Sequence, residues 1–238
     1  MSSLGIPNLD ADLERQLSAG LNQVEELLSS HIQGDYPLVV ETSRHLVEAG
    51  GKRFRPLITL IASHFGNGQS RQVIEAAVVC ELTHVATLYH DDVMDDAPTR
   101  RGVPTAQNVF SNSIAILIGD LLLARASILS TRLGIEAITM QANTFERLCI
   151  GQLNETVGAS NGEDAIEHYI QVLADKTGSL IAASAKLGVM MGNADSKYLE
   201  PLSEFGEKIG VAFQLIDDVI DISEAGPSGK TPGTDLRA

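Results

Sequence analysis

The chain has 238 residues, 44% of them hydrophobic and 20% charged, a composition typical of one large or two small globular domains. Its formal net charge of -14 argues against nucleic acid as the main partner, because backbone binding relies on clustered Lys and Arg. The first residues lack a basic region followed by an apolar stretch, so we expect no signal peptide and a cytoplasmic location.

Apolar residues recur at helical spacing along most of the chain, first at Leu13, Leu17, Leu21, Val24 and Leu28. Alternating strand-like runs with hairpin signals are missing. Glycine and proline mark breaks at residues 34–37, 50–51, 66–68, 98, 158–162, 192–193 and 226–233. The sequence therefore predicts an all-α protein whose residues 1–238 form one continuous domain.

Two sequence features bear on the cellular compartment. The longest apolar run, residues 114–124, contains Asp120 and is too short to span a bilayer, so we expect no integral membrane segment. Cys80 and Cys149 stand in apolar helical contexts without metal-binding spacing, which favours reduced thiols in the core.

An apolar helical segment ends in four aspartates within residues 91–96. An ideal helix places His84, Asp91 and Asp95 on one face, with Asp92 a little round the side. Pro98 then breaks the helix, and two basic residues, Arg100 and Arg101, follow.

A second segment, residues 205–222, repeats this layout late in an apolar helix. Its carboxylates are Asp217, Asp218 and Asp221, and a Gly/Pro break and Lys230 follow them. One such motif is often only a solvated helix face. Two copies with cations beside both indicate a shared purpose.

Paired carboxylates at about 5 Å repel by roughly 0.8 kcal/mol in water and by about 3 kcal/mol at an effective dielectric of 20. A hard divalent cation reverses this effect, and Mg²⁺ is commonly shared between one or two carboxylates and a substrate phosphate. The two acidic segments therefore predict a diphosphate held between two helices by Mg²⁺, with Arg and Lys gripping the phosphate.

Three further places carry polar residues that have both a functional and an ordinary interpretation. Lys52, Arg53 and Arg55 follow Gly50-Gly51, and they equally fit a basic helix start. Lys176 and Thr177 lie in an Ala- and Leu-rich stretch, where a lysine extending to solvent would also explain the pattern. Gln214 could be a core amide that bonds locally.

These motifs occur in a fixed order, and together they resemble the trans-isoprenyl diphosphate synthases, also called polyprenyl synthetases. The stretches that carry the resemblance are GGKRFRP, HDDVMDDAPTRRGVPT, GQLNE, DKTGSL, FGEKIGVAFQLIDDVID and GKTPGTDLR. The resemblance covers nearly the whole chain from about residue 45, and the two acidic motifs with their flanks are its most specific part.

The resemblance implies a bundle of mostly antiparallel helices around a central cavity, usually in a homodimer. It also implies residue roles. Asp91, Asp92, Asp95, Asp217, Asp218 and Asp221 would bind Mg²⁺, while Arg100, Lys176 and Lys230 would contact the allylic diphosphate. Lys52, Arg55, His84 and Arg101 would bind isopentenyl diphosphate, and Thr177 and Gln214 would lie near the reacting carbons.

The resemblance implies that residues just before the first acidic motif set the product length. Ala86 and Thr87 are small, which favours a product longer than geranylgeranyl diphosphate, such as a quinone side-chain precursor; a farnesyl or geranylgeranyl synthase is the alternative. A lipid product also suggests transient contact with a membrane surface.

Two departures from the family stand out. Ser111-Asn112 replaces a Gly-Asn pair, and the family continues past residues 235–237 with further helices, so we expect the domain to lack them. The rival functions are a terpene cyclase, which usually has a different second motif, and a non-catalytic subunit of a heteromeric synthase, which tends to lose one motif.

Overall fold

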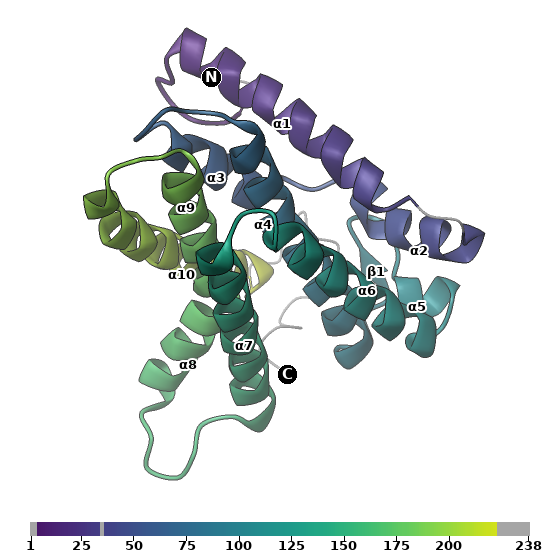
Figure 1. The fold of residues 1–238 in the computed structure, drawn as a ribbon. Helices are drawn as coiled ribbons and strands as arrows, with labels where there is room; N and C mark the ends of the chain where they lie inside the picture. Colours follow the sequence, from purple (N-terminus) through teal and green to yellow (C-terminus); the bar gives the residue numbers. More distant parts are fainter. Residues whose placement is uncertain (1–3, 34–35, 223–238) are drawn as a thin grey trace.

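The computed structural model describes residues 4–33 and 36–222, with side chains up to residue 220, and the all-α prediction is confirmed there (Figure 1). The α-helices are α1 (Ala11–His31), α2 (Pro37–Glu48), α3 (Phe54–Ser63), α4 (Arg71–Met94), α5 (Ala106–Val109), α6 (Asn112–Ser130), α7 (Ile135–Val157), α8 (Ala165–Leu173), α9 (Ser179–Met191) and α10 (Leu199–Ile222). A π-helical turn, η1 (Ala174–Gly178), and a short 3₁₀ turn, η2 (Ser196–Tyr198), complete the helical elements.

The helices begin and end where the sequence chemistry demands. The side chains of Asp10, Ser70 and Asp164 cap the first turns of α1, α4 and α8 by accepting backbone N–H bonds. The breaks predicted at residues 50–51, 66–68, 98, 158–162 and 192–193 all fall between helices, and Pro37, the last residue of the break predicted at 34–37, begins α2. The predicted break at 226–233 lies outside the described residues.

Helix α4 forms the centre of the core, because every residue from Val73 to Ala86 except His84 is buried. It packs most extensively against α6 and also contacts α1, α3 and α9, and α1 lies across the outside of the fold (Figure 1). The acidic end of α4 is therefore anchored by a long buried stem.

A two-stranded hairpin departs from the strand-free prediction. β1 (Thr99–Arg100) pairs antiparallel with β2 (Val103–Pro104), with Arg100 opposite Val103. The two turn residues, Arg101 and Gly102, have φ of +54° and +79°. Positive φ at both central residues defines a type I′ turn, which matches the twist of paired strands. The hairpin is too short to show in an alternating pattern.

Helices α7 and α8 run side by side away from the rest of the molecule and are joined by the loop of residues 158–164 (Figure 1). The chain then passes through η1 directly into α9, and α10 packs on both α9 and η1. This arrangement brings residues from α7, η1 and α10 together.

Helix α6 is longer than the apolar run seen in the sequence. By length and composition its 19 residues are enough to cross a membrane, and 39% of its apolar window is buried in the fold. Its buried residues, Ala115, Ile118, Leu122, Ala126 and Leu129, recur at helical spacing and pack in the main core. One face of α6 thus belongs to the globular core, while its outer face also carries the exposed apolar residues Ile116, Leu117 and Ile128.

The prediction for the cysteines is half right. Cys80 is buried in the core, where burial raises the pKa of its thiol to about 11. Cys149 is exposed on α7, so its assignment to the core was wrong. Neither cysteine forms a disulfide.

Candidate functional site

The first acidic segment is the C-terminal end of α4, which closes with a Schellman motif. Asp96 takes φ +47°, and the Ala97 N–H donates to the Asp92 carbonyl at 3.0 Å. The side chain of Gln107 donates to the same carbonyl at 2.7 Å. The cap and this amide fix how the helix end presents its carboxylates.

The three predicted ligands of this segment lie in different environments. Asp92 has 0% exposed surface, and its Oδ1 accepts a hydrogen bond from Arg100 Nε at 2.7 Å and forms an ion pair with Arg100 Nη2 at 2.7 Å. Asp91 is half-buried, and Asp95 is exposed at the helix end. Asp91 and Asp95 therefore have the surface with which to reach a ligand, while Asp92 anchors Arg100.

Burial raises the pKa of Asp91 to about 6. The field of Lys176 opposes that rise, and the nearby carboxylates Asp95 and Glu155 add to it. These groups come from η1, α4 and α7, so Asp91 faces the junction of those elements. Because the nearby cations do not offset the cost of burying its negative charge, the Asp91 carboxylate favours a further cation as its partner.

Lys176 and Thr177 belong to η1, a π-turn of the kind that is frequent at functional sites. Lys176 is paired with Glu155 on α7. Thr177 Oγ1 lies 3.5 Å from Gln214 Oε1, and Gln214 Nε2 donates to Asp218 Oδ1 at 3.0 Å. One dipeptide thus acts on Asp91 through the charge of Lys176 and contacts the second acidic segment through Thr177.

The second acidic segment occupies the last turns of α10. Asp218 is half-buried, and its second oxygen accepts a hydrogen bond from the Tyr169 hydroxyl on α8. Asp217 is exposed. The side chains of Asp221 and Lys230 lie outside the described residues, so their predicted roles stay predictions.

A group of cations lies between α3, α4 and the hairpin. Burial lowers the pKa of Arg55 and of Arg101, and the buried carboxylate of Glu81 opposes the shift in both. Burial and the surrounding guanidinium groups hold the pKa of His84 well below its usual range, so His84 is a neutral hydrogen-bonding group near pH 7.

Two residues of the upstream basic stretch have separate contacts. Arg53 pairs with Glu25 and Glu81 and donates to the Val47 carbonyl at 2.9 Å, so its guanidinium is committed to the fold. Lys52 is exposed, with its ammonium 5.2 Å from the ring centroid of Phe213 on α10. Lys52 therefore approaches the α10 face of the site.

The two predicted chain-length residues differ in exposure. Ala86 is fully buried in the main core, whereas Thr87 is half-buried and donates to the His84 carbonyl at 2.8 Å. Thr87 is accordingly the more accessible of the two.

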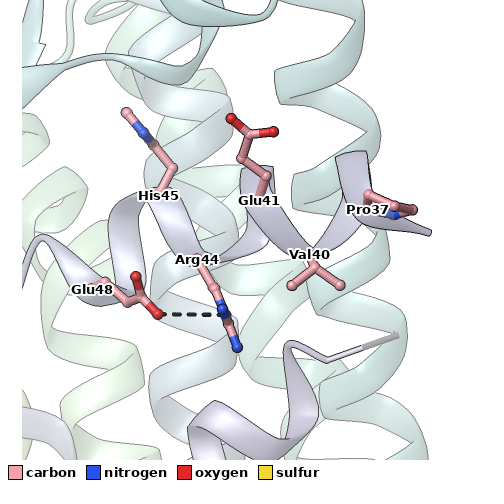
Figure 2. Close-up of a pocket in the computed structure, with 6 residues that line it drawn as sticks. All are labelled: Pro37, Val40, Glu41, Arg44, His45 and Glu48. Carbon is pink, nitrogen blue, oxygen red and sulfur yellow. Dashed lines mark ion pairs between the residues drawn. The ribbon is translucent and has the colours of Figure 1, made fainter. Parts of the chain in front are cut away.

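Two surface hollows lie away from the predicted residues. One, of about 630 Å³, is lined by six side chains of α2, which include the ion pair of Arg44 and Glu48 (Figure 2). The other, of about 510 Å³, lies between α7, α9 and α10, and Arg147 is one of the residues that line it. Neither contains a residue that the sequence assigned to the site.

The acidic residues suit a magnesium ion in donor chemistry, since Mg²⁺ takes oxygen ligands. Asp92 Oδ2 is buried without a hydrogen-bond partner, an oxygen that an ion or its water shell would satisfy. Among the described side chains, no three His, Cys, Asp or Glu residues already form a metal cage. An Mg²⁺ site that shares the ion with a substrate phosphate does not need three protein ligands already in place.

Sequence reasoning missed the residues that hold these groups in place. Glu81, Glu155, Tyr169 and Arg147 contact the predicted residues or their neighbours across helices. Glu155 stood within a recognised motif, so its position was a usable signal. The others occupy ordinary helical positions whose partners are distant in sequence.

Comparisons with known proteins identify the family and the fold. A model of the polyprenyl synthetase family matches residues 36–238. A nonaprenyl diphosphate synthase from Mycobacterium tuberculosis is 46% identical over 235 residues, which cover 98% of this chain and 70% of that protein.

Solved structures show the same fold. A decaprenyl diphosphate synthase from Rhodobacter capsulatus has a TM-score of 0.87 at 32% identity, over 95% of this chain and 70% of that one. A geranylgeranyl pyrophosphate synthase from Corynebacterium glutamicum, complexed with calcium and isoprenyl diphosphate, has a TM-score of 0.83 at 46% identity, over 96% and 69% of the two chains.

Proposed function

The chain belongs to the polyprenyl synthetase family, and we propose that it condenses isopentenyl diphosphate with an allylic diphosphate to form an all-trans polyprenyl diphosphate. The observation that carries this proposal is the position of Lys176-Thr177. Lys176 lies in the field of Asp91, and Thr177 contacts the amide that bonds Asp218. One diphosphate between the acidic segments would be within reach of both.

The residues of the chain divide the work of binding the allylic diphosphate. Asp91, Asp92 and Asp95 from the C-terminal end of α4, with Asp217, Asp218 and Asp221 from α10, would hold Mg²⁺, which would neutralise charge on the departing pyrophosphate. Arg100, held by Asp92, would donate to the same oxygens, as would Lys176 once released from Glu155, and Lys230 would add a third cation. These donors stabilise charge as it develops on the leaving group.

The second substrate needs its own cationic site. Arg55, Arg101 and Lys52 would bind the diphosphate of isopentenyl diphosphate, and His84 would donate as a neutral imidazole. In the reaction the allylic C–O bond breaks with release of pyrophosphate, the isopentenyl double bond forms the new C–C bond with the allylic cation, and the released pyrophosphate takes the proton that leaves the adjacent carbon. Thr177 and Gln214 would line the region of the reacting carbons.

We propose a product longer than geranylgeranyl diphosphate, because Ala86 and Thr87, five and four residues before Asp91, are small, and relatives include the nonaprenyl and decaprenyl synthases. Geranylgeranyl diphosphate is the second candidate. It is favoured by the 46% identity to the Corynebacterium glutamicum geranylgeranyl pyrophosphate synthase.

Assembly as a homodimer in the cytoplasm is also part of the proposal. Helix α6 leaves Ile116, Leu117 and Ile128 exposed on the side away from its buried face, and a second copy would cover them. Sedimentation velocity of the wild type and of Leu117→Lys tests this, with a shift from dimer to monomer expected in the variant. A wild-type monomer at micromolar concentration would contradict it.

The activity is tested by incubating the 238-residue chain with an allylic diphosphate, labelled isopentenyl diphosphate and Mg²⁺, then sizing the dephosphorylated products. We expect incorporation that EDTA abolishes and that Asp91→Asn lowers at least 100-fold, about 2.7 kcal/mol. Asp12→Asn, an exposed aspartate of α1, is the matched control and should retain activity. Metal-independent incorporation, or none, would contradict the proposal.

A further inference from the structure

The π-turn η1 places Lys176 and Thr177, yet its own backbone gives little reason for it to stay in place. A π-turn replaces the i to i+4 bonds of an α-helix by longer ones and is rare. It runs without a break between α8 and α9. Side chains or neighbouring helices must therefore set the direction in which Lys176 points.

Arg147 on α7 supplies that connection. Its Nε donates to Oδ1 of Asp175, and Asp175 is the residue just before Lys176. The Nη1 of Arg147 donates to Oε2 of Glu207 on α10 at 2.5 Å. The second oxygen of Asp175 accepts from Gln171 Nε2 at 2.9 Å. One guanidinium thus ties three elements together, and we call this set of Arg147, Asp175 and Glu207 the Arg147 bridge.

The backbone of η1 also touches both flanking helices where they carry glycine. A Cβ on Gly151 of α7 would lie 2.8 Å from the backbone nitrogen of Lys176. A Cβ on Gly210 of α10 would lie 2.7 Å from the Cα of Gly178. The turn is therefore held directly between α7 and α10. A shift in the spacing of those helices would move Lys176.

Because Asp175 is buried, the Arg147 bridge must neutralise a charge that water does not reach. Asp175 is 6% exposed, so its charge must be matched within the protein. The planar fork of arginine can serve two carboxylates at once, which the single ammonium of lysine does less well. Arg147 is thus placed to fix the spacing of α7 and α10 around the turn.

We propose that Arg147 is a positioning residue that holds η1 in the register from which Lys176 binds the diphosphate of the allylic substrate. This inference rests on the proposed function for its substrate. Arg147 acts through Lys176 and touches no substrate. Its removal should weaken the allylic site and leave the isopentenyl site unchanged.

The test is a double-mutant cycle on inorganic pyrophosphate binding, measured by calorimetry on the 238-residue chain in Mg²⁺. Arg147→Met should weaken binding about tenfold in the wild-type background and less than about twofold in the Lys176→Met background, because coupled residues are not additive. The KM for the allylic diphosphate should rise by a similar factor, while the KM for isopentenyl diphosphate stays constant.

Arg71→Met is the matched control, since it breaks an arginine–glutamate pair within α4 far from η1. If Arg147→Met does not fold, Glu207→Gln enters the same cycle, because Glu207 is partly exposed and the amide keeps the shape. Equal weakening in both Lys176 backgrounds, or a loss of melting temperature with both KM values unchanged, overturns the inference. Absence of pyrophosphate binding by the wild type would instead contradict the proposed function.

Discussion

Tyr89 joins the helix of the first acidic segment to α2. Its hydroxyl is fully buried, donates to the Thr42 carbonyl and accepts from the Leu46 N–H at 3.3 Å. We predict that Tyr89→Phe lowers the free energy of unfolding by about 1–3 kcal/mol, because both backbone groups lose a buried partner. Urea unfolding measures this. Tyr36→Phe, at an exposed position, should change stability by less than about 0.5 kcal/mol.

His84 should make the stability of the fold sensitive to acid. Its pKa in the folded state is lowered by burial and by Arg55 and Arg101, while the unfolded chain has the ordinary value near 6.5. Unfolding therefore takes up a proton below about pH 6.5, so this residue's contribution to stability is complete above that pH and is lost as the pH falls toward the folded pKa.

We therefore expect that the unfolding free energy of the wild type falls relative to that of His84→Gln by up to about 1.4 kcal/mol per pH unit below pH 6.5. Urea unfolding at pH 7.5, 6.5 and 5.5 gives the comparison. Parallel pH curves for the two proteins would show that His84 is not held neutral.

At the residue scale, the sequence was most informative where charge clusters in one stretch. Asp91, Asp92, Asp95 and Arg100 were predicted from one short charged stretch, and the structure pairs Asp92 with Arg100, while the ligand roles of these residues stay predictions. Glu81 and Arg147 could not be found in this way, because their meaning depends on partners brought by other helices. The opposite error was Cys149, whose apolar neighbours in sequence do not bury it.

The β1–β2 hairpin is the element that carries Arg100 and Arg101. Gly102 has φ +79°, a conformation that costs a residue with a Cβ roughly 1–2 kcal/mol. We predict that Gly102→Ala weakens Mg²⁺-pyrophosphate binding several-fold, because it displaces the turn next to Arg100. Gly158→Ala, at φ +78° in the α7–α8 loop with equally open surroundings, should leave binding unchanged. Equal effects on binding would contradict the role of the hairpin.

The contact between α4 and α6 depends on a close approach at His90. Its Nε2 lies 3.1 Å from the Ile116 carbonyl, and a Cβ on Gly119 would come within 2.3 Å of that nitrogen. We predict that Gly119→Ala costs about 1–3 kcal/mol and that the same change costs less in a His90→Ala background. Thermal unfolding of the wild type, Gly119→Ala, His90→Ala and the double variant gives the four stabilities. Additive effects of the two substitutions on stability would contradict this contact.

Element boundaries were largely predictable because glycine and proline act locally. The breaks at 50–51, 66–68 and 158–162 follow from the backbone preferences of those residues. The π-turn η1 was not predictable, since its sequence reads as continuous helix and its register is set by α7 and α10. The hairpin was missed because two-residue strands leave no periodicity.

On the scale of the molecule, the fold uses long buried helices to bring charges together that would otherwise separate. Helix α4 places Asp91 where burial raises its pKa, and η1 places Lys176 where its charge opposes that rise. The carboxylates of α10 join this group through Gln214 and Thr177. The central claim is that Mg²⁺ and a diphosphate make this arrangement favourable.

The most direct test is calorimetric titration of the 238-residue chain with inorganic pyrophosphate, with and without Mg²⁺, for the wild type, Asp91→Asn and Asp217→Asn. The account predicts binding only with Mg²⁺, weakened at least tenfold by either substitution, about 1.4 kcal/mol each. Pyrophosphate binding that is equally strong without metal, or that is insensitive to both substitutions, would contradict it.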